Sequence, residues 1–262
     1  MNVYWYELKA NLKFVVIWLI VRVGIGLLMT SFYPTIAKDL DAFIEIMNNY
    51  PEAIRAAFGL NLKTMNSVVG YYSSFPLTFL LICSSIEAMI MGISILSKEE
   101  RDKTADFLFT KPLSRITILT AKMKAIVTLL LVSNVILFVI ICLVVLGFSN
   151  GDFNLSTFTL LTLTLFMIQL IFVAIGMLIS VILPKVKAPL SISMGVVLGF
   201  YTLSTFADDK IRAFIPFKYF DSVYILEHQA YELGYLILLF TVILVATIST
   251  YIIYSKKDIH SV

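Results

Sequence analysis

The sequence has few charged residues for its length. Lys, Arg, Asp and Glu make up 14% of the 262 residues, whereas 60% are hydrophobic, and the mean hydropathy is +0.94. A soluble domain of this size would have too little polar surface to cover its core. The composition therefore predicts an all-helical integral membrane protein, with residues 1–262 forming a single transmembrane domain.

Residue types that carry catalysis or bind metals are also scarce. Cys83 and Cys142 fall inside apolar runs, where cysteine usually behaves as a small hydrophobic residue, so no disulfide or metal framework is expected. His228 and His260 lie outside those runs, and no HExxH motif, GxSxG motif or P-loop occurs. We therefore expect no catalytic site, no metal site and no ATP site in this chain. The net charge of +3 does not indicate a nucleic-acid partner, and none is expected.

Six apolar runs are long enough to cross a bilayer, which takes about 20 residues. The expected spans are residues 14–33, 76–97, 125–147, 155–183, 188–206 and 233–254. Aromatic residues beside lysines in residues 1–13 predict a separate interfacial helix. Ser73, Ser74 and Pro76 predict a bend where the second span begins.

Two polar segments, residues 34–66 and 207–232, connect spans on the side opposite the chain ends. The first is expected to be mostly helical, with a break at residues 48–51 and a second helix that has Pro51 at its first position and stops near Gly59. Of the 20 Lys and Arg residues, six fall in these two segments, 13 fall on the other side, and Arg22 lies within a span. Because basic residues favour the cytoplasm, both termini and residues 98–124 are predicted to be cytoplasmic, and the two segments extracellular.

The longest charged interruption between apolar runs is residues 98–124. Glu99 and Glu100 are expected in the first turn of a short helix over residues 98–110, where acidic side chains oppose the positive end of the helix dipole. Ala105, Leu108 and Phe109 recur at helical spacing and form a narrow apolar stripe. A helix this short is marginal alone in water, which indicates that a partner docks on the stripe. The alternative is a connector that lies on the lipid headgroups.

Two further residues predict where this helix ends and where the next helix begins. Pro112 disfavours helix at the residue before it, so the helix should end near Thr110. Ser114 can then cap a new helix that leads into the third span.

The same stretch resembles the cytoplasmic signature of ABC-2 type exporter permeases. That signature has an acidic pair, a Thr, apolar residues, x-Pro, Ser-Arg and a later Lys. The matching residues here are Glu99, Glu100, Thr104, Phe107, Leu108, Phe109, Lys111, Pro112, Ser114, Arg115 and Lys122. Lys103 stands where many members have Gly. The resemblance implies that residues 98–110, Lys103 and Ala105 included, form a coupling helix that docks in a cleft of an ATPase subunit.

The resemblance also implies a function. It is to permeases of the bacitracin or antimicrobial-peptide type and the phenol-soluble-modulin type, which export amphipathic or hydrophobic substrates across the bacterial cell membrane. Two ATP-binding subunits would bind ATP and Mg²⁺, and a second permease copy or a homologous permease would complete the transporter among membrane lipids. A non-transporting sensor or assembly protein, a channel and a sodium-extrusion permease remain alternatives.

Four polar residues stand out within the expected spans: Arg22, Glu87, Asn134 and Gln169. Arg22 and Glu87 lie about 12 Å and about 15 Å from the same side, at a rise of about 1.5 Å per residue. Because charges are costly in hydrocarbon, an ion pair between them is one hypothesis. In the other, Arg22 extends to the headgroups and Glu87 is protonated or faces the pathway. Asn134 and Gln169 are expected to form interhelical hydrogen bonds.

The segment before the last span contains PFKYFD at residues 216–221. This string resembles one found at the same place in a branch of ABC-2 permeases, and implies short, partly inserted helices beside the external end of the pathway. Phe217, Tyr219 and Phe220 are therefore candidates for an exit gate. The alternative is an external loop anchored by aromatic residues at the membrane interface.

The predicted topology can be tested by thiol labelling of intact cells. A cysteine introduced at Asn61 or Asp208 should react with a membrane-impermeant reagent, whereas one at Asp102 should react only after permeabilisation. The opposite pattern would reverse the orientation.

Overall fold

The computed structural model describes residues 3–101, 114–149, 151, 153–183, 186–206 and 208–256. Within these ranges the regular structure is helical and no β-strand occurs. The elements are α1 (Val3–Ser31), α2 (Tyr33–Lys38), α3 (Leu40–Asn48), α4 (Glu52–Ala57), α5 (Val68–Arg101), α7 (Arg115–Phe148), α8 (Leu155–Ile182), α9 (Pro189–Phe206), η1 (Asp209–Phe214), η2 (Pro216–Lys218), α10 (Ser222–His228) and α11 (Leu233–Lys256).

Six of these helices are long and apolar enough to cross a membrane: α1, α5, α7, α8, α9 and α11. This confirms the predicted all-helical fold with six spans. On α7 the side chains of Leu130 and Leu137 are buried against neighbouring helices, whereas those of Val132 and Val139 are exposed. Both faces are apolar because one contacts protein and the other suits lipid.

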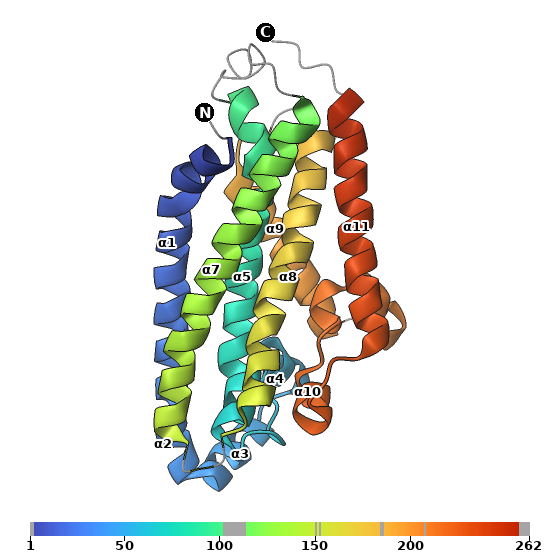
Figure 1. Cartoon of the computed structure of the whole chain (residues 1–262). Helices are drawn as coiled ribbons and strands as arrows, with labels where there is room; N and C mark the ends of the chain where they lie inside the picture. Colours follow the sequence, from blue (N-terminus) through green and yellow to red (C-terminus); the bar gives the residue numbers. More distant parts are fainter. Residues whose placement is uncertain are drawn as a thin grey trace.

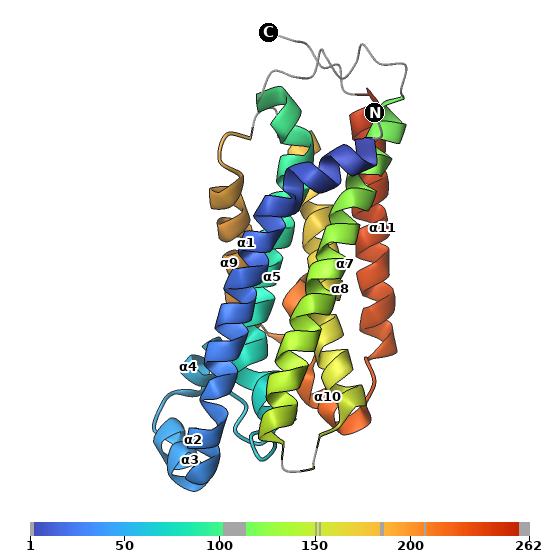
Figure 2. The ribbon, with the colours of Figure 1, turned by 60° about the vertical axis from the view of Figure 1, so that its left-hand side comes forward.

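The helices α5 and α8 lie at the centre of the bundle and pack along each other (Figures 1 and 2). The helix α1 packs against α7 and α5, α9 against α5, and α11 against α8. One end of the bundle contains the start of α1, the end of α5, the start of α7 and the end of α11 (Figure 1). The short helices α2, α3, α4 and α10 lie at the opposite end. We call these the termini end and the short-helix end.

Two predicted boundaries are wrong, one where the first span begins and one where the second span ends. The expected interfacial helix at residues 1–13 is continuous with the first span in α1, although Figure 2 shows its first turns inclined to the rest. The helix α5 continues beyond residue 97 to Arg101, so Glu99 and Glu100 lie in its last turn and not in the first turn of a separate helix. Lys, Glu and Arg have high helix propensity, so the charged sequence that follows the span does not end the helix.

Other local predictions agree with the structure in part. The helix α3 ends at Asn48, within the expected break, and α4 begins at Glu52; Pro51 lies at the N-cap position and not at the predicted first helical position. The chain then turns at Gly59, whose φ of 66° is in the left-handed region that favours glycine. Pro76 lies inside α5, which continues on both sides of it, and the expected bend there stays a prediction.

The close contact between α5 and α8 depends on two glycines. A Cβ atom on Gly92 would lie 2.4 Å from the carbonyl oxygen of Val173, and one on Gly176 would lie 2.8 Å from that of Met89. Both distances are too short for a side chain, so the two backbones approach each other only because these residues lack one. Small residues are a general means of helix association in membranes, where lipid competes with apolar packing.

This contact predicts opposite effects for two Gly→Ala changes. Gly92→Ala should destabilise the protein by about 1–3 kcal/mol, because the added methyl group overpacks the α5–α8 contact. Gly195→Ala on α9 is the matched control, because a Cβ there has no neighbour within 4 Å. This control should leave stability unchanged or raise it by up to about 1 kcal/mol through higher helix propensity. Thermal unfolding in detergent measures both, and equal effects would contradict the contact.

Candidate functional site

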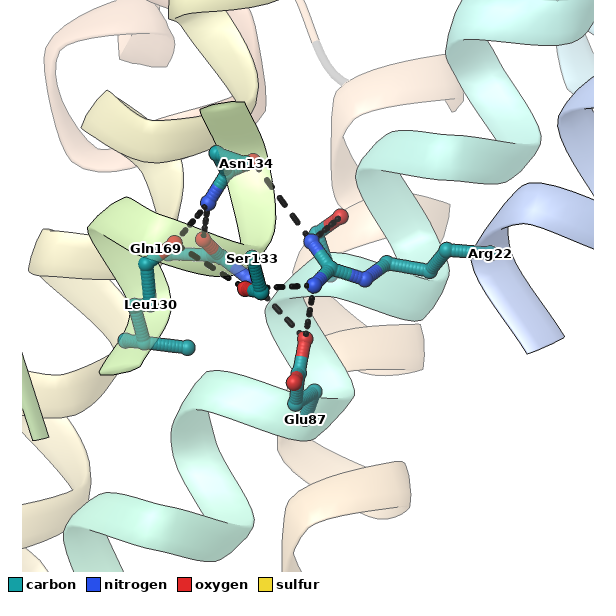
Figure 3. A network of polar contacts seen from close by, with 7 residues as sticks. Arg22, Glu87, Leu130, Ser133, Asn134 and Gln169 are labelled. Carbon is teal, nitrogen blue, oxygen red and sulfur yellow. Dashed lines mark hydrogen bonds and ion pairs between the residues drawn. The ribbon is translucent and has the colours of Figure 1, made fainter. Parts of the chain in front are cut away.

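Polar side chains from four helices meet in the interior of the bundle (Figure 3). Arg22 comes from α1, Glu87 from α5, Asn134 from α7 and Gln169 from α8. The exposed fractions of Arg22, Glu87 and Gln169 are 0%, and that of Asn134 is 6%. The structure therefore brings together all four intramembrane polar residues singled out in the sequence. We call them, with Ser84 and Ser133, the polar cluster.

Arg22 and Glu87 form an ion pair, with Nη2 of Arg22 3.1 Å from Oε2 of Glu87. The same nitrogen donates a hydrogen bond of 2.9 Å to Oγ of Ser133. The other terminal nitrogen, Nη1, donates longer hydrogen bonds of 3.5 Å to Ser84 and Asn134. The guanidinium thus points inward to partners on α5 and α7 and does not extend to the headgroups.

Gln169 connects the ion pair to α7. Its Nε2 donates to Oε2 of Glu87 at 3.0 Å, and its Oε1 accepts a hydrogen bond from Nδ2 of Asn134. Nδ2 of Asn134 also donates to the carbonyl oxygen of Leu130 at 2.7 Å. Asn134 and Gln169 form the interhelical hydrogen bond expected of them, and they also belong to the same network as the two charged residues.

The sequence did not indicate Ser84 and Ser133. Each stands beside a polar residue that it did indicate, Ser84 one helical turn before Glu87 and Ser133 next to Asn134. Extending the search by one turn from each charged residue would have found Ser84.

The polar cluster is neutral overall but not fully satisfied. The charges of Arg22 and Glu87 cancel, which offsets the cost of burying either alone. Nε of Arg22 and Oε1 of Glu87 have no hydrogen-bond partner within the part of the chain that the structure describes. Buried polar atoms without a partner are uncommon in folded proteins, and each costs stability. Over the same part of the chain, no group of three or more His, Cys, Asp or Glu side chains is placed to hold a metal ion.

A second buried ion pair lies toward the termini end. Nζ of Lys122 on α7 is 3.5 Å from Oε1 of Glu7 on α1 and donates a hydrogen bond of 2.9 Å to the carbonyl oxygen of Ile95 on α5. The side chain of Lys122 is 2% exposed. Lys122 thus joins three helices where α5 ends and α7 begins.

Comparison with known proteins assigns this helix bundle to a family. The family model described as ABC-2 family transporter protein matches residues 1–259. The chain belongs to this family. No curated protein matches it. The family and the six apolar helices identify it as a multi-pass membrane protein of the cell membrane and a permease component of an ABC transporter, a class that associates with ABC ATPase subunits.

The coupling region of this permease is described only at its edges. Ser114 caps α7 as predicted, its Oγ accepting a hydrogen bond of 3.2 Å from the backbone N–H of Thr117, and Arg115 is the first residue of α7. Glu99 and Glu100 belong to the last turn of α5. Outside the described residues lie Lys103, Thr104, Ala105, Phe107, Leu108, Phe109 and Pro112. The coupling role of these residues stays a prediction.

The aromatic candidates for an external gate pack against the bundle. The ring of Phe217 lies 5.4 Å from that of Phe172 on α8, between centroids, and Phe220 lies 5.5 Å from Tyr231. The hydroxyl of Tyr219 donates to the carbonyl oxygen of Ala213 at 2.7 Å. Burial raises the pKa of Tyr219, and it raises that of Tyr231 to about 12, so both hydroxyls remain protonated donors near neutral pH. The short helices η1, η2 and α10 match those implied for this segment. The gating role itself stays a prediction.

The ion pair in the polar cluster predicts strong coupling between two substitutions. Arg22→Ala and Glu87→Ala should each destabilise the permease by about 3–5 kcal/mol, because each leaves a buried charge unpaired. The double variant should be no less stable than either single variant. Unfolding in detergent measures all three, with Lys124→Ala, at an exposed position on α7, expected to change stability by less than about 0.5 kcal/mol. Simple additivity of the two losses would show that the residues act independently.

Proposed function

We propose that this permease is the transmembrane subunit of an ATP-driven exporter. Its substrate would be an amphipathic or hydrophobic molecule, such as an antimicrobial or toxin-like peptide, a drug or a lipid. Two separate ATPase subunits would bind ATP and Mg²⁺, so the chain has no catalytic role of its own. A second copy of the chain or a homologous permease would complete the transport pathway.

The observation that carries the proposal is the position of Lys122. Residues 102–113 connect α5 to α7, and they contain most of the string that resembles a coupling helix. Lys122 on α7 contacts α5, on the other side of this connection, through its hydrogen bond to Ile95. It also contacts α1 through its ion pair with Glu7. A force applied to the connection by an ATPase subunit would therefore act on three spans together.

The polar cluster extends this mechanical link into the bundle. Glu87 on α5 contacts Arg22 of α1 and Gln169 of α8. Buried charges resist separation, because breaking such a pair leaves an uncompensated charge in a low dielectric. A movement of α5 is thus expected to move α1 and α8 with it, which is how ATP-driven closure outside the membrane could reorient the spans.

The chemistry of the spans supports an amphipathic or hydrophobic substrate over a sodium ion. The two charged residues of the polar cluster neutralise each other, so the cluster presents no net negative charge to attract a cation. The sodium-extrusion alternative predicts sodium-stimulated ATP hydrolysis by the reconstituted transporter. A non-transporting sensor or a channel predicts no ATP hydrolysis coupled to movement of any substrate.

The coupling proposal is tested by changing the apolar stripe of residues 98–110. The double change Leu108→Asp and Phe109→Asp should abolish the stimulation of ATP hydrolysis by transported substrate, because it places charge on the docking surface. Membrane insertion should be unaffected. The measurements are ATP hydrolysis in proteoliposomes and copurification of the ATPase subunit.

Asp106→Asn, which lies off the stripe, is the control and should leave both measurements near their original values. Normal assembly and transport by the double variant would show that the stripe does not couple the two subunits.

A further inference from the structure

A cavity of about 210 Å³ opens among α5, α8 and α9, toward the short-helix end of the bundle. Phe217 and Phe220 form one wall, and Ser222 and Ile225 of α10 lie beside them. The polar cluster takes no part in it, because neither Arg22 nor Glu87 lines the cavity. The cavity is therefore a separate site.

Hydroxyl groups supply the polar part of the cavity wall. They belong to Ser73 and Thr78 of α5, Thr164 of α8, Tyr201, Ser204 and Thr205 of α9, and Ser222 of α10. Among the described residues that line the cavity, none is charged. The site thus offers neither a cation for an anionic group nor a carboxylate for a strong ion pair.

Five of these hydroxyls already donate their hydrogen atom to a main-chain carbonyl oxygen. Ser73 donates to the carbonyl oxygen of Gly70 at 2.7 Å, and Thr78 donates to that of Ser74 at 2.8 Å. On α9, Ser204 and Thr205 both donate to the carbonyl oxygen of Tyr201, at 2.6 Å and 3.2 Å. The hydroxyl of Tyr201 donates to the carbonyl oxygen of Ala57 at 2.7 Å.

A hydroxyl has one hydrogen to donate and two lone pairs that accept. Because the donors are engaged with the main chain, these oxygens can offer only lone pairs to a molecule in the cavity. We call Ser73, Thr78, Tyr201, Ser204 and Thr205 the acceptor wall. Apolar side chains and the two phenylalanine rings complete the lining. The ring of Phe217 is held edge-to-face against Tyr201, with centroids 5.7 Å apart.

We infer that this cavity binds the amine or amide group of an amphipathic molecule. Such a group donates N–H hydrogen bonds to the acceptor wall, and an amine that is protonated also gains from the faces of nearby aromatic rings. A carboxylate or phosphate brings only acceptors and would face lone pairs. This molecule would be a transported substrate, and that part of the inference rests on the proposed export function; the binding itself does not.

The size of the cavity limits how much of the molecule it holds. A volume of about 210 Å³ is below the roughly 300–1,000 Å³ of pockets that enclose a whole drug-sized ligand. The cavity therefore takes the polar group and its first methylenes, and the rest of an apolar chain extends beyond it.

The test uses the full-length permease in phosphatidylcholine nanodiscs, without ATPase subunits. Ser222→Cys is introduced into a Cys83→Ala, Cys142→Ala background, and the rate of thiol modification reports on access to the cavity. Octylamine should slow the modification, whereas octanoate, with the same chain and a carboxylate, should not. Equal protection by both probes would show binding through the chain alone, and protection by neither would show a cavity that holds only water. Either result overturns the inference.

Two variants of the acceptor wall make the test specific. Thr78→Val and Thr205→Val each remove one acceptor and should raise the octylamine concentration for half-protection about fivefold, as expected for one lost hydrogen bond. Thr202→Val is the matched control, because Thr202 also donates to a backbone carbonyl on α9, that of Leu198, but is exposed outside the cavity. Circular dichroism confirms that each variant is folded.

Unchanged protection in both acceptor variants would refute the acceptor wall. Because no ATPase subunit is present, a failure of ATP-driven export would not alter these measurements. A failure here would in turn leave the export proposal intact.

Discussion

The guanidinium of Arg22, buried among apolar helices, sets a requirement that three other helices meet. A single unpaired arginine at the centre of a span costs about 2.5–3.5 kcal/mol on insertion scales, which is a large part of a protein's net stability. Glu87 neutralises the charge, while Ser133, Asn134 and Gln169 supply hydrogen bonds to the pair or to each other. Each helix must present one particular face, since successive residues on a helix are about 100° apart. The polar cluster therefore fixes how α1, α5, α7 and α8 are rotated about their axes.

Rotation alone does not fix the distance between helices, and small residues do so here. Apolar packing gives little preference for protein over lipid within a membrane, so close backbone approach and polar contacts decide which helices associate. Gly92 and Gly176 allow α5 and α8 to approach at the point where each would otherwise carry a side chain. The polar cluster includes Glu87 and Gln169 on the same two helices, within two turns of these glycines. The central pair of the bundle is thus specified by both kinds of contact.

The sequence predicted features that depend on position along a helix and missed those that depend on neighbours. Hydropathy located six spans, and counting residues placed Arg22 and Glu87 at matching depths before their contact was known. The cap at Ser114 and the break before α4 follow from local backbone chemistry and were also predicted. By contrast, the pairing of Lys122 with Glu7 depends on how α1 inclines toward α7. No periodicity reveals this, because α7 is apolar on both faces. The acceptor wall was missed for a similar reason, since it combines serines, threonines and a tyrosine from two helices, none of which indicates a binding site by itself.

The helix α5 connects three sites that the sequence presents separately. Ile95 accepts the bond from Lys122, Glu87 lies in the polar cluster, and Thr78 lines the cavity. At about 1.5 Å per residue, Ile95 and Glu87 are about 12 Å apart along α5, and Glu87 and Thr78 about 13.5 Å. A helix transmits displacement along its axis through its backbone hydrogen bonds, and these three positions lie in the part of α5 that follows its single proline, Pro76. A shift imposed at its cytoplasmic end, in the proposed topology, would therefore reach the acceptor wall, whose other members lie mainly on α9. Since α9 packs against α5 but contributes no residue to the polar cluster, a sliding of α5 past α9 would move the two halves of the wall relative to each other. Hydrogen bonds weaken steeply with distance and angle, so the geometry links movement at the termini end to a change in affinity at the short-helix end.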